Sequence, residues 1–476
     1  MLRRALFLLA MVLPAGAGAT DFWVDPVLGS PAGDGSAGSP WQTIQQVIED
    51  GRIETRHWES LPYVPGLGFV TVHPGAPVKA GDTIWLRTGD HGEIFVRGAY
   101  NELPITIAAA PGARPRLTRI VLSAAQNWIV RGLAVSPSHA LPPLPPETMI
   151  DVENHSWHGP SWDIVVEGCE LYSVADASGW SAGDWVNAAS SGIAVDGDRV
   201  VLRGNDLRNV RFGISVSGAD ALVAFNRIDG FSADGLRGLG DGGVFEYNLV
   251  QNSYVGDPPD GNHDDGFQSW SFGPGGVGTG EVRDVVLRGN LFINSTPVGG
   301  PPPELRTALQ GIGCFDGMFV HWTVENNVVI TDHWHGISLY GAVDSRIVNN
   351  TVIDAVPGQP GPPWIMTNSN RGTPSQNVVV RNNLAADYSL AGTAIVADHN
   401  LEFSDAAALF VAPPFDVRLL PGSAAEDAGS DVLAPAVDAA GTPRPQGAGW
   451  DLGAFERCPG CIFRDDFERG DLARWD

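Results

Sequence analysis

The sequence predicts an all-β fold, a right-handed parallel β-helix (a solenoid) with an N-terminal capping helix. Three observations predict it: an asparagine recurs along the chain, a short strand pattern follows most of these asparagines, and the repeats have no helical period. The shorter intervals between the asparagines define a repeat of about 22 residues, as expected for coils that must stack to bury their apolar side. The recurring residues are Asn205, Asn226, Asn248, Asn290, Asn327, Asn350 and Asn383.

We expect the asparagines to form a buried ladder. Stacked asparagine side chains can bond to one another and to the turn backbone, which satisfies their polar groups inside the protein. Cys169, in "VVEGCELYS", falls in the same column, which indicates that the column points inward. Cys314 also falls on an inward position, so both thiols are predicted to lie in the core.

The short strands after the first five asparagines can be placed in register. They read "FGISVS", "DGLRGL", "DGFQSW", "QGIGCF" and "HGISLY". Side chains alternate along a strand, so we take the residue after each strand glycine as inward and the next one as outward. The predicted inward residues are Ile214, Leu236, Phe267, Ile312 and Ile337. The predicted outward residues are Ser215, Arg237, Gln268, Gly313 and Ser338.

A single amphipathic helix is predicted before the first coil. In "SPWQTIQQVIEDG", Ser39 is the expected N-cap, Pro40 the first helical residue and Gly51 the stop signal. Such a helix would cover the open end of the solenoid and its strand edge.

The N-terminus has the pattern of a secretory signal. Arg3 and Arg4 precede an apolar run, and Ala17-Gly18-Ala19 fits the small-residue cleavage rule. We therefore divide the chain into a signal peptide (1–19), a β-helix domain (20–456) and a short tail (457–476). The expected location is secreted, periplasmic or at the cell surface, and no later segment is long and apolar enough to span a membrane.

The composition restricts the partners. The formal net charge is −26, and this field repels nucleic acid and anionic lipid. We expect no nucleic-acid partner, no certain cofactor, a polysaccharide ligand and a monomer. Lys79 is the only lysine, so a lysine base is nearly excluded. Cys458 and Cys461, in "CPGC", are predicted to form a disulfide in an oxidising compartment.

Four inserted segments fall in one slot, after the asparagine step and before the next strand. They are "VADASGWSAGDWVNAAS", "NSYVGDPPDGNHDD", "NSTPVGGPPPELRTALQ" and "DAVPGQPGPPW". Loops in one slot of successive coils hang from one rim, so they are predicted to form a wall beside the outward face of the following strands. Loops on a rigid scaffold are where functional residues concentrate.

Polar and aromatic side chains are predicted to converge beside this wall. Stacked strands lie about 4.8 Å apart, which brings like charges together and raises the pKa of one carboxylate, as acid–base catalysis requires. The candidate catalytic residues are His263, Asp265, Asp234, Arg237 and His335. The candidate substrate-binding residues are Gln268, Trp270, Gln310, His333 and Trp334, and Asp264 is a candidate calcium ligand.

Both ends of the repeat region resemble a known group of proteins. "WVDPVLGSPAGDGSAGSPWQTIQQVI", "VKAGDTIWLRTGDHGE" and "PITIAAAPGARPRL" resemble the N-terminal region of secreted bacterial right-handed β-helix (pectate-lyase-like) proteins. These include the alginate lyase and chondroitinase type of polysaccharide lyase. "LLPGSAAEDAGSD" and "GTPRPQGAGWDLGAFE" are similar to the C-terminal region of many of them. The resemblance implies the fold, export and a role with polysaccharides.

Three functions remain open. In a lyase or epimerase, a base takes the proton beside a uronate carboxylate. His263 or His335 is the candidate base, and Arg237 would neutralise the carboxylate or, like the arginine of pectate lyases, be the base itself. In a hydrolase, two carboxylates act as acid and base. Asp264-Asp265 and the "HGIS" at His335 are similar to polygalacturonase motifs, although no cysteine flanks the pair and no Arg-Ile-Lys motif follows.

In the third function the protein is not an enzyme, and the acidic cluster binds calcium while the groove holds a glycan or a cell-surface partner. We expect a polysaccharide lyase first, a polygalacturonase-like hydrolase second and a binding protein third.

Overall fold

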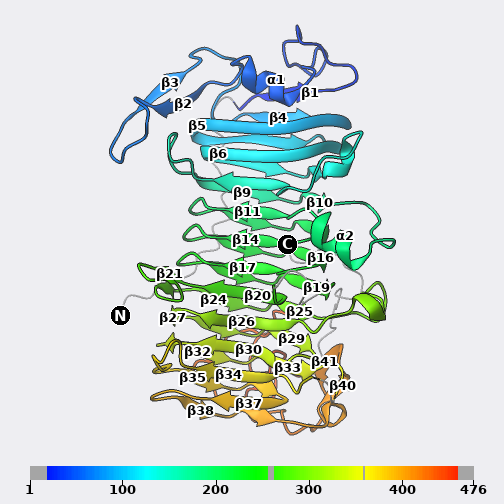
Figure 1. The fold of residues 1–476 in the computed structure, drawn as a ribbon, viewed down its shortest axis with the longest axis vertical. Helices are drawn as coiled ribbons and strands as arrows, with labels where there is room; N and C mark the ends of the chain where they lie inside the picture. Colours follow the sequence, from blue (N-terminus) through cyan, green and yellow to red (C-terminus); the bar gives the residue numbers. More distant parts are fainter. Residues whose placement is uncertain (1–18, 256–261, 358–359, 459–476) are drawn as a thin grey trace.

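The computed structural model describes residues 19–255, 262–357 and 360–458. Nearly all of the expected signal peptide and tail therefore lies outside the described residues. Within them the chain winds into a tall stack of coils, with the N-terminal strands at one end and the C-terminal strands at the other (Figure 1). The predicted β-helix is confirmed.

Each coil contributes strands to three stacks, within which neighbouring strands are parallel. The first stack contains β8 (Ile150–Glu153), β11 (Ile193–Val195), β14 (Ile214–Val216), β17 (Leu236–Gly238), β20 (Asp265–Trp270), β26 (Gln310–Asp316), β30 (His335–Tyr340), β34 (Trp364–Asn368) and β37 (Asp387–Leu390).

The second stack contains β9 (Trp162–Glu167), β12 (Val201–Arg203), β15 (Leu222–Ala224), β18 (Val244–Glu246), β24 (Val286–Arg288), β28 (Thr323–Glu325), β32 (Arg346–Val348), β35 (Val379–Arg381) and β38 (Val396–Asp398). The third contains β7 (Ala134–Val135), β10 (Glu170–Tyr172), β13 (Asp206–Val210), β16 (Arg227–Phe231), β19 (Leu249–Ser253), β25 (Leu291–Ile293), β29 (Val328–Thr331), β33 (Thr351–Asp354), β36 (Leu384–Ala385) and β39 (Leu401–Glu402).

The predicted strand register is confirmed. Leu236 pairs with Phe267, Phe267 with Ile312, and Ile312 with Ile337. All four side chains are fully buried. The next residue of each strand forms the outward column, in which Arg237 pairs with Gln268.

The asparagine ladder runs through the turn between the second and third stacks. In each step one side-chain amide donates to the side-chain oxygen of the next asparagine, from Asn205 to Asn226 at 2.9 Å and onward. Cys169 N–H donates to Asn205 at 3.0 Å, which confirms the place of the cysteine in the column. The ladder also continues one step further than predicted, from Asn383 to Asn400.

The N-terminal cap differs in detail from the prediction. β1 (Asp21–Val24) pairs with β4 (Thr83–Leu86), and α1 (Ile44–Glu49) follows β1. The N-cap is Thr43, not Ser39, because the Trp41 N–H donates to Trp23 and holds this segment extended beside β1. The helix can therefore begin only after the bridge between Trp41 and Val24.

The remaining N-terminal strands are β2 (Thr55–Trp58) and β3 (Phe69–Val72), which are antiparallel, and the long pair β5 (Gly89–Ala109) and β6 (Pro115–Arg131). Outside the stacks lie β21 (Phe272–Gly273), β22 (Gly276–Val277), β23 (Glu281–Arg283), β27 (Met318–Val320) and β31 (Ala342–Val343). The antiparallel strands β40 (Phe410–Ala412) and β41 (Asp416–Leu419) lie at the C-terminal end.

The inserted segments lie on one rim, as predicted. All four connect a strand of the third stack to the next strand of the first stack. The segment after β10 contains a helix that the sequence did not predict, α2 (Ala182–Asn187), in which the buried Trp185 stacks on Tyr254 with ring centres 4.1 Å apart. Figure 1 shows α2 projecting from the side of the solenoid.

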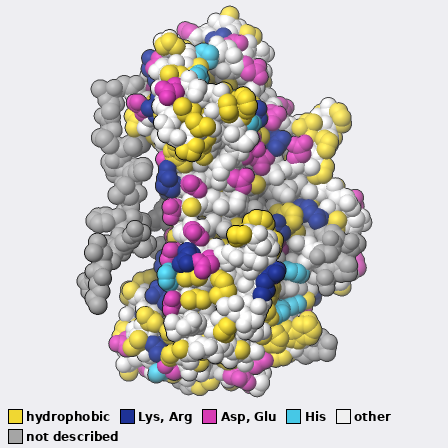
Figure 2. All heavy atoms as spheres, turned by 60° about the vertical axis from the view of Figure 1, so that its left-hand side comes forward, with side chains coloured by type: hydrophobic (Ala, Val, Ile, Leu, Met, Phe, Trp, Pro, Cys, Tyr) yellow, Lys and Arg dark blue, Asp and Glu magenta, His cyan; other side chains and the backbone are white. Residues whose placement is uncertain are grey.

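Outward charges are paired between coils. Arg131 and Arg203 both contact Glu167, and Arg288 contacts Glu325 at 2.7 Å. Figure 2 shows acidic and basic side chains next to one another on one face of the molecule. These outward-facing arginines are therefore paired with acids where coils stack, and the net negative charge comes from the remaining carboxylates.

The cysteines agree with the predictions where the structure describes them. Cys169 and Cys314 are free and buried. Cys458 is disulfide-bonded, and its predicted partner Cys461 lies outside the described residues. Among the described residues, no helix is long and apolar enough to cross a membrane.

Candidate active site

The candidate active site lies where the chain passes from the inserted rim into the first stack. Asp234 precedes β17, Asp265 begins β20 and His335 begins β30. The Asp265 N–H donates to Asp234 Oδ1 at 3.1 Å. Neighbouring coils thus bring these two acidic residues together, as the register predicts.

His263 and Asp265 form the central pair. His263 Nδ1 lies 2.8 Å from Asp265 Oδ2, and Gln268 Nε2 donates to the same oxygen at 3.0 Å. The Asp265 side chain is completely buried, whereas 49% of the His263 side chain is exposed. A buried carboxylate thus binds one ring nitrogen of an accessible imidazole and leaves Nε2 for proton transfer.

The surroundings raise the pKa values of both His263 and Asp265. The hydrogen bond to Asp265 raises the pKa of His263 to about 9. Burial raises the pKa of Asp265 to about 8, and the nearby charge of Asp234 adds to this effect. The pair therefore retains a proton at neutral pH and releases it in the alkaline range.

Asp234 binds the arginine of the site. Arg237 Nε donates to Asp234 Oδ2 at 2.5 Å. The guanidinium carbon lies 3.9 Å from the ring centre of Phe212 and 5.2 Å from that of Trp270. Burial raises the pKa of Asp234, and the charge of Arg237 opposes this effect. Arg237 therefore places a fixed positive charge between two aromatic rings.

His335 supplies a second imidazole, whose pKa is shifted in the opposite direction from that of His263. Ser338 Oγ lies 2.9 Å from His335 Nδ1, and Trp364 Nε1–H donates to the same nitrogen at 3.2 Å. Since both groups can donate, the hydrogen-bond network assigns Nδ1 as the acceptor and places the ring proton on Nε2. Burial, with smaller contributions from the charges of His333 and His263, lowers the pKa of His335 to about 4.

Aromatic rings connect the two imidazoles. The ring centre of Phe315 lies 6.0 Å from that of His263 and 4.8 Å from that of His335. His333 stacks on His335 at 5.3 Å, and burial lowers the pKa of His333 to about 4. Trp334, beside His333, is 45% exposed and is the most accessible large ring of the group.

Three more predicted site residues are buried, in addition to Asp234 and Asp265: Gln268, Gln310 and Asp264. Gln268, Gly313 and Ser338 were expected on the exposed face, but all three are buried. Gln268 is covered because it lies against His263 and donates to Asp265, and Ser338 because it contacts His335. Gln310 is buried as well. Asp264 is buried and accepts a hydrogen bond from Ser253 Oγ at 2.8 Å, and burial raises its pKa well above the usual range. Of these side chains, Gln268 supports the His263–Asp265 pair directly.

The described residues do not fit a calcium site at Asp264. Among them, no group of three or more His, Cys, Asp or Glu side chains is placed to hold a metal ion. Asp264 uses one of its oxygens to accept from Ser253. A calcium requirement therefore stays a prediction without a carboxylate cage to support it.

Sequence reasoning missed two contributors and misplaced a third. A Cβ at Gly313 would lie 1.9 Å from Asp265 Oδ1, so only glycine leaves room for this carboxylate. Phe315 follows Gly313 by two residues, and strand alternation could have placed it on the same face. Trp364 was assigned to a loop but begins β34 and contacts His335.

Comparisons with known proteins agree with the fold. Residues 191–384 match the family model described as "Right handed beta helix region". No curated protein sequence matches the chain.

Three solved structures are similar at low identity. Pectate lyase Pel9A is 15% identical, with a TM-score of 0.45 over 93% of this chain and 98% of that chain. A rhamnogalacturonan lyase is 13% identical, with a TM-score of 0.42 over 83% of this chain and 91% of that one. A GH136 lacto-N-biosidase from Eubacterium ramulus is 12% identical, with a TM-score of 0.43 over 79% and 68% of the two chains. The family-model match and the stacked strands lead to one conclusion: the chain is a right-handed parallel β-helix protein.

Proposed function

We propose that the protein is an exported carbohydrate-active enzyme, a polysaccharide lyase that cleaves a uronate-containing glycan by β-elimination. The observation that carries the proposal is the contrast within the His263–Asp265 pair. The imidazole is half exposed and the carboxylate that binds it is completely buried. This arrangement supports proton transfer by an imidazole, which is the chemistry that β-elimination needs.

Each residue has a role in this proposal. His263 Nε2 takes the proton from the carbon beside the uronate carboxylate, while Asp265 holds Nδ1–H. Arg237 offsets the charge that develops on that carboxylate. His335, neutral with its proton on Nε2, donates a hydrogen bond to the glycosidic oxygen as that oxygen leaves. The exposed ring of Trp334 is available to stack on a sugar.

Burial of the carboxylates favours the lyase over the hydrolase. A hydrolase needs two carboxyl groups that both reach the scissile bond. The side chains of Asp234 and Asp265 are both 0% exposed. We therefore place an epimerase, rather than the hydrolase that was expected second, as the alternative to the lyase. The two imidazoles that contact Phe315 could remove a proton and return one.

A substrate screen tests the proposal. The full chain is incubated with polygalacturonate, alginate, chondroitin and a neutral glucan, and the ultraviolet absorbance of the unsaturated uronate is recorded. We expect this absorbance with at least one uronate polymer and none with the glucan. New reducing ends without the absorbance would establish hydrolysis instead. Exchange of solvent deuterium into intact polymer would establish epimerisation, and tight binding without any reaction would establish a binding protein.

A further inference from the structure

A pocket of about 390 Å³ lies away from the candidate active site, on the outer face of the third stack near its N-terminal end. Strands β10 and β13 supply Glu170, Tyr172 and Arg208, and the beginning of β6 supplies Arg116. Arg114 comes from the turn before β6. The candidate active site uses a different stack and later coils.

The lining of this pocket is rich in arginine although the chain is acidic, and each of these arginines is ion-paired to Glu170, Asp90 or Asp206. The sequence has 55 acidic and 29 basic residues, yet the ten lining residues include three arginines and one acid. The Arg114 side chain is 81% exposed, and among the described residues it makes one hydrogen bond, to Glu170 at 3.2 Å. A guanidinium has five N–H donors, so most donors of Arg114 are available to a ligand.

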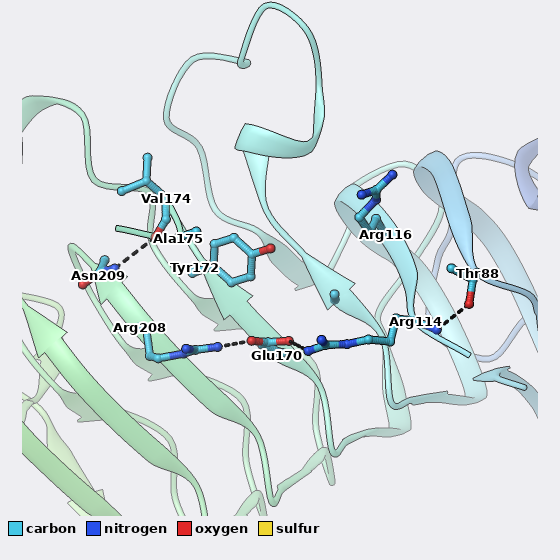
Figure 3. Close-up of a pocket in the computed structure, with 10 residues that line it drawn as sticks. Thr88, Arg114, Arg116, Glu170, Tyr172, Val174, Ala175, Arg208 and Asn209 are labelled. Atoms are coloured by element: carbon cyan, nitrogen blue, oxygen red, sulfur yellow. Dashed lines mark hydrogen bonds and ion pairs between the residues drawn. The ribbon is translucent and has the colours of Figure 1, made fainter. Parts of the chain in front are cut away.

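Protein contacts hold the arginines in place. Figure 3 shows Arg208, Glu170 and Arg114 in one row, with the carboxylate between the two guanidiniums. Asp90 accepts two hydrogen bonds from Arg116, at 2.6 and 2.9 Å, which leaves the other donors of that guanidinium for a ligand. The Arg116 guanidinium is thus oriented by two hydrogen bonds, which lowers the cost of binding an anion, whereas Arg114 is held, among the described residues, by its single bond to Glu170.

An aromatic ring lies beside the donors. The Tyr172 hydroxyl lies 2.7 Å from His139 Nε2, and the two rings meet edge to face with centres 5.5 Å apart. Figure 3 shows the Tyr172 ring and Arg116 on either side of the space above Glu170. Aromatic faces stack on sugar rings, and arginine is the side chain best suited to bind carboxylates with two hydrogen bonds.

We propose that this pocket is a second glycan-binding site, which takes a carboxylated sugar residue of an acidic polysaccharide. The sugar ring packs on Tyr172, and its carboxylate binds Arg114 and Arg116. The site anchors the polymer at a distance from the candidate active site. This inference names the substrate class of the proposed function but does not depend on the reaction.

Calorimetric titration with trigalacturonate tests the proposal. The titrated protein is the full chain carrying His263→Ala, so that the ligand is not consumed. We expect the R114A/R116A double variant to bind at the pocket at least about tenfold more weakly, because it loses charge-assisted hydrogen bonds. The R199A/R283A variant is the matched control, because it removes two other exposed, ion-paired arginines and the same total charge.

Equal affinity of the R114A/R116A variant and its parent would overturn the proposal. Equal losses of affinity in both double variants would overturn it too, because the loss would then follow from the total charge rather than from the pocket.

Maltotriose and inorganic sulfate serve as further probes. Binding of maltotriose as tight as trigalacturonate would contradict selection of an acidic sugar, and binding of sulfate alone would make the pocket an anion site without sugar recognition. If substitutions at His263 leave product formation unchanged while R114A/R116A loses binding, the proposed role of His263 in the reaction is contradicted. The glycan-binding role of the pocket is then still supported.

Discussion

His263 and His335 show how two identical side chains acquire different properties within one site. Asp265 is the main cause that raises the pKa of His263 to about 9. Burial without a carboxylate partner lowers the pKa of His335 to about 4. At neutral pH one imidazole therefore tends to carry a charge and the other does not. Opposite shifts of this kind give the two imidazoles different protonation states, and His263 can act as the base only after it loses its proton in the alkaline range.

Replacement of His263 by alanine tests the base. We expect kcat/KM on the uronate polymer to fall by at least about a hundredfold, the lower range for loss of a general base. The midpoint of unfolding should change little, because the side chain is half exposed. His321→Ala is the matched control, since His321 is also half exposed and contacts the carboxylate of Asp284. A large loss of stability without a specific loss of activity would make His263 structural.

Replacement of Asp265 by asparagine tests the pKa argument. A base works when deprotonated, so in the parent the rate should rise with pH toward about 9. The variant removes the carboxylate that raises the pKa of His263, which should then fall back toward its ordinary value of 6.5. We expect the rising limb of the pH–rate profile to move to lower pH while its height drops. A limb that stays in place would show that Asp265 does not set this pKa.

At the scale of elements, the asparagine ladder links the turns of successive coils. Asn290 accepts from the backbone and side chain of Asn248 and donates to Phe245 O and to Asn327 Oδ1. Its neighbours in the ladder are all buried. One side chain therefore satisfies polar groups on both adjacent coils, which explains why the repeat returns to the same residue type.

Asn290→Ala should destabilise the fold strongly. It leaves both Asn248 donors and the Phe245 carbonyl without this partner, and each unsatisfied buried group costs about 1–3 kcal/mol. We expect a loss of about 3 kcal/mol or more in denaturant unfolding, with a shifted midpoint. Asn187→Ala, at an exposed position of α2, should cost far less because the hydrogen bond that the Asn187 side-chain amide donates to Gly183 O is exposed to water. Similar losses in both variants would argue against the ladder as a main source of stability.

For the whole molecule, the net charge of −26 opposes the approach of a polyuronate. Added salt screens this repulsion, because the Debye length falls from about 30 Å at 0.01 M to about 10 Å at 0.1 M. Arg237, whose side chain is 19% exposed, acts at shorter range and should be screened less than the exposed arginines of the pocket.

We therefore expect kcat/KM on a polyuronate to rise as salt is added from about 0.01 M toward about 0.1 M, because the shorter Debye length screens the repulsion. Steady-state kinetics at a series of sodium chloride concentrations measures this. A short neutral glycan that binds should show no such rise. A steady fall of kcat/KM with salt would mean that local arginines, rather than the overall charge, govern association.

Much of the scaffold could be predicted from local patterns. The period of the asparagines placed the ladder, and strand alternation placed Phe267 inside and Arg237 outside. The common slot of the insertions placed them on one rim. These features depend on geometry that repeats from coil to coil, so a single chain carries enough copies of the pattern to reveal them.

The candidate site was predictable only in part. The register brought Asp234, Asp265 and His335 to one side of the solenoid, but no pattern indicated that Asp265 is buried while His263 is exposed. The position of the α1 N-cap at Thr43 likewise depends on the backbone hydrogen bond between Trp41 and Trp23 of β1. Local helix signals do not contain that contact.

The repeat, the inward column and the shared rim follow from the sequence because strand alternation and coil stacking obey short-range rules. The accessible imidazole, the space at Gly313 and the arginine pocket depend on how segments from different coils pack. Arg114 and Arg208 are 94 residues apart in the chain and meet on Glu170 only because coils stack in space. Burial, ion pairing and pKa depend on such long-range neighbours, and the folded coils determine which neighbours meet.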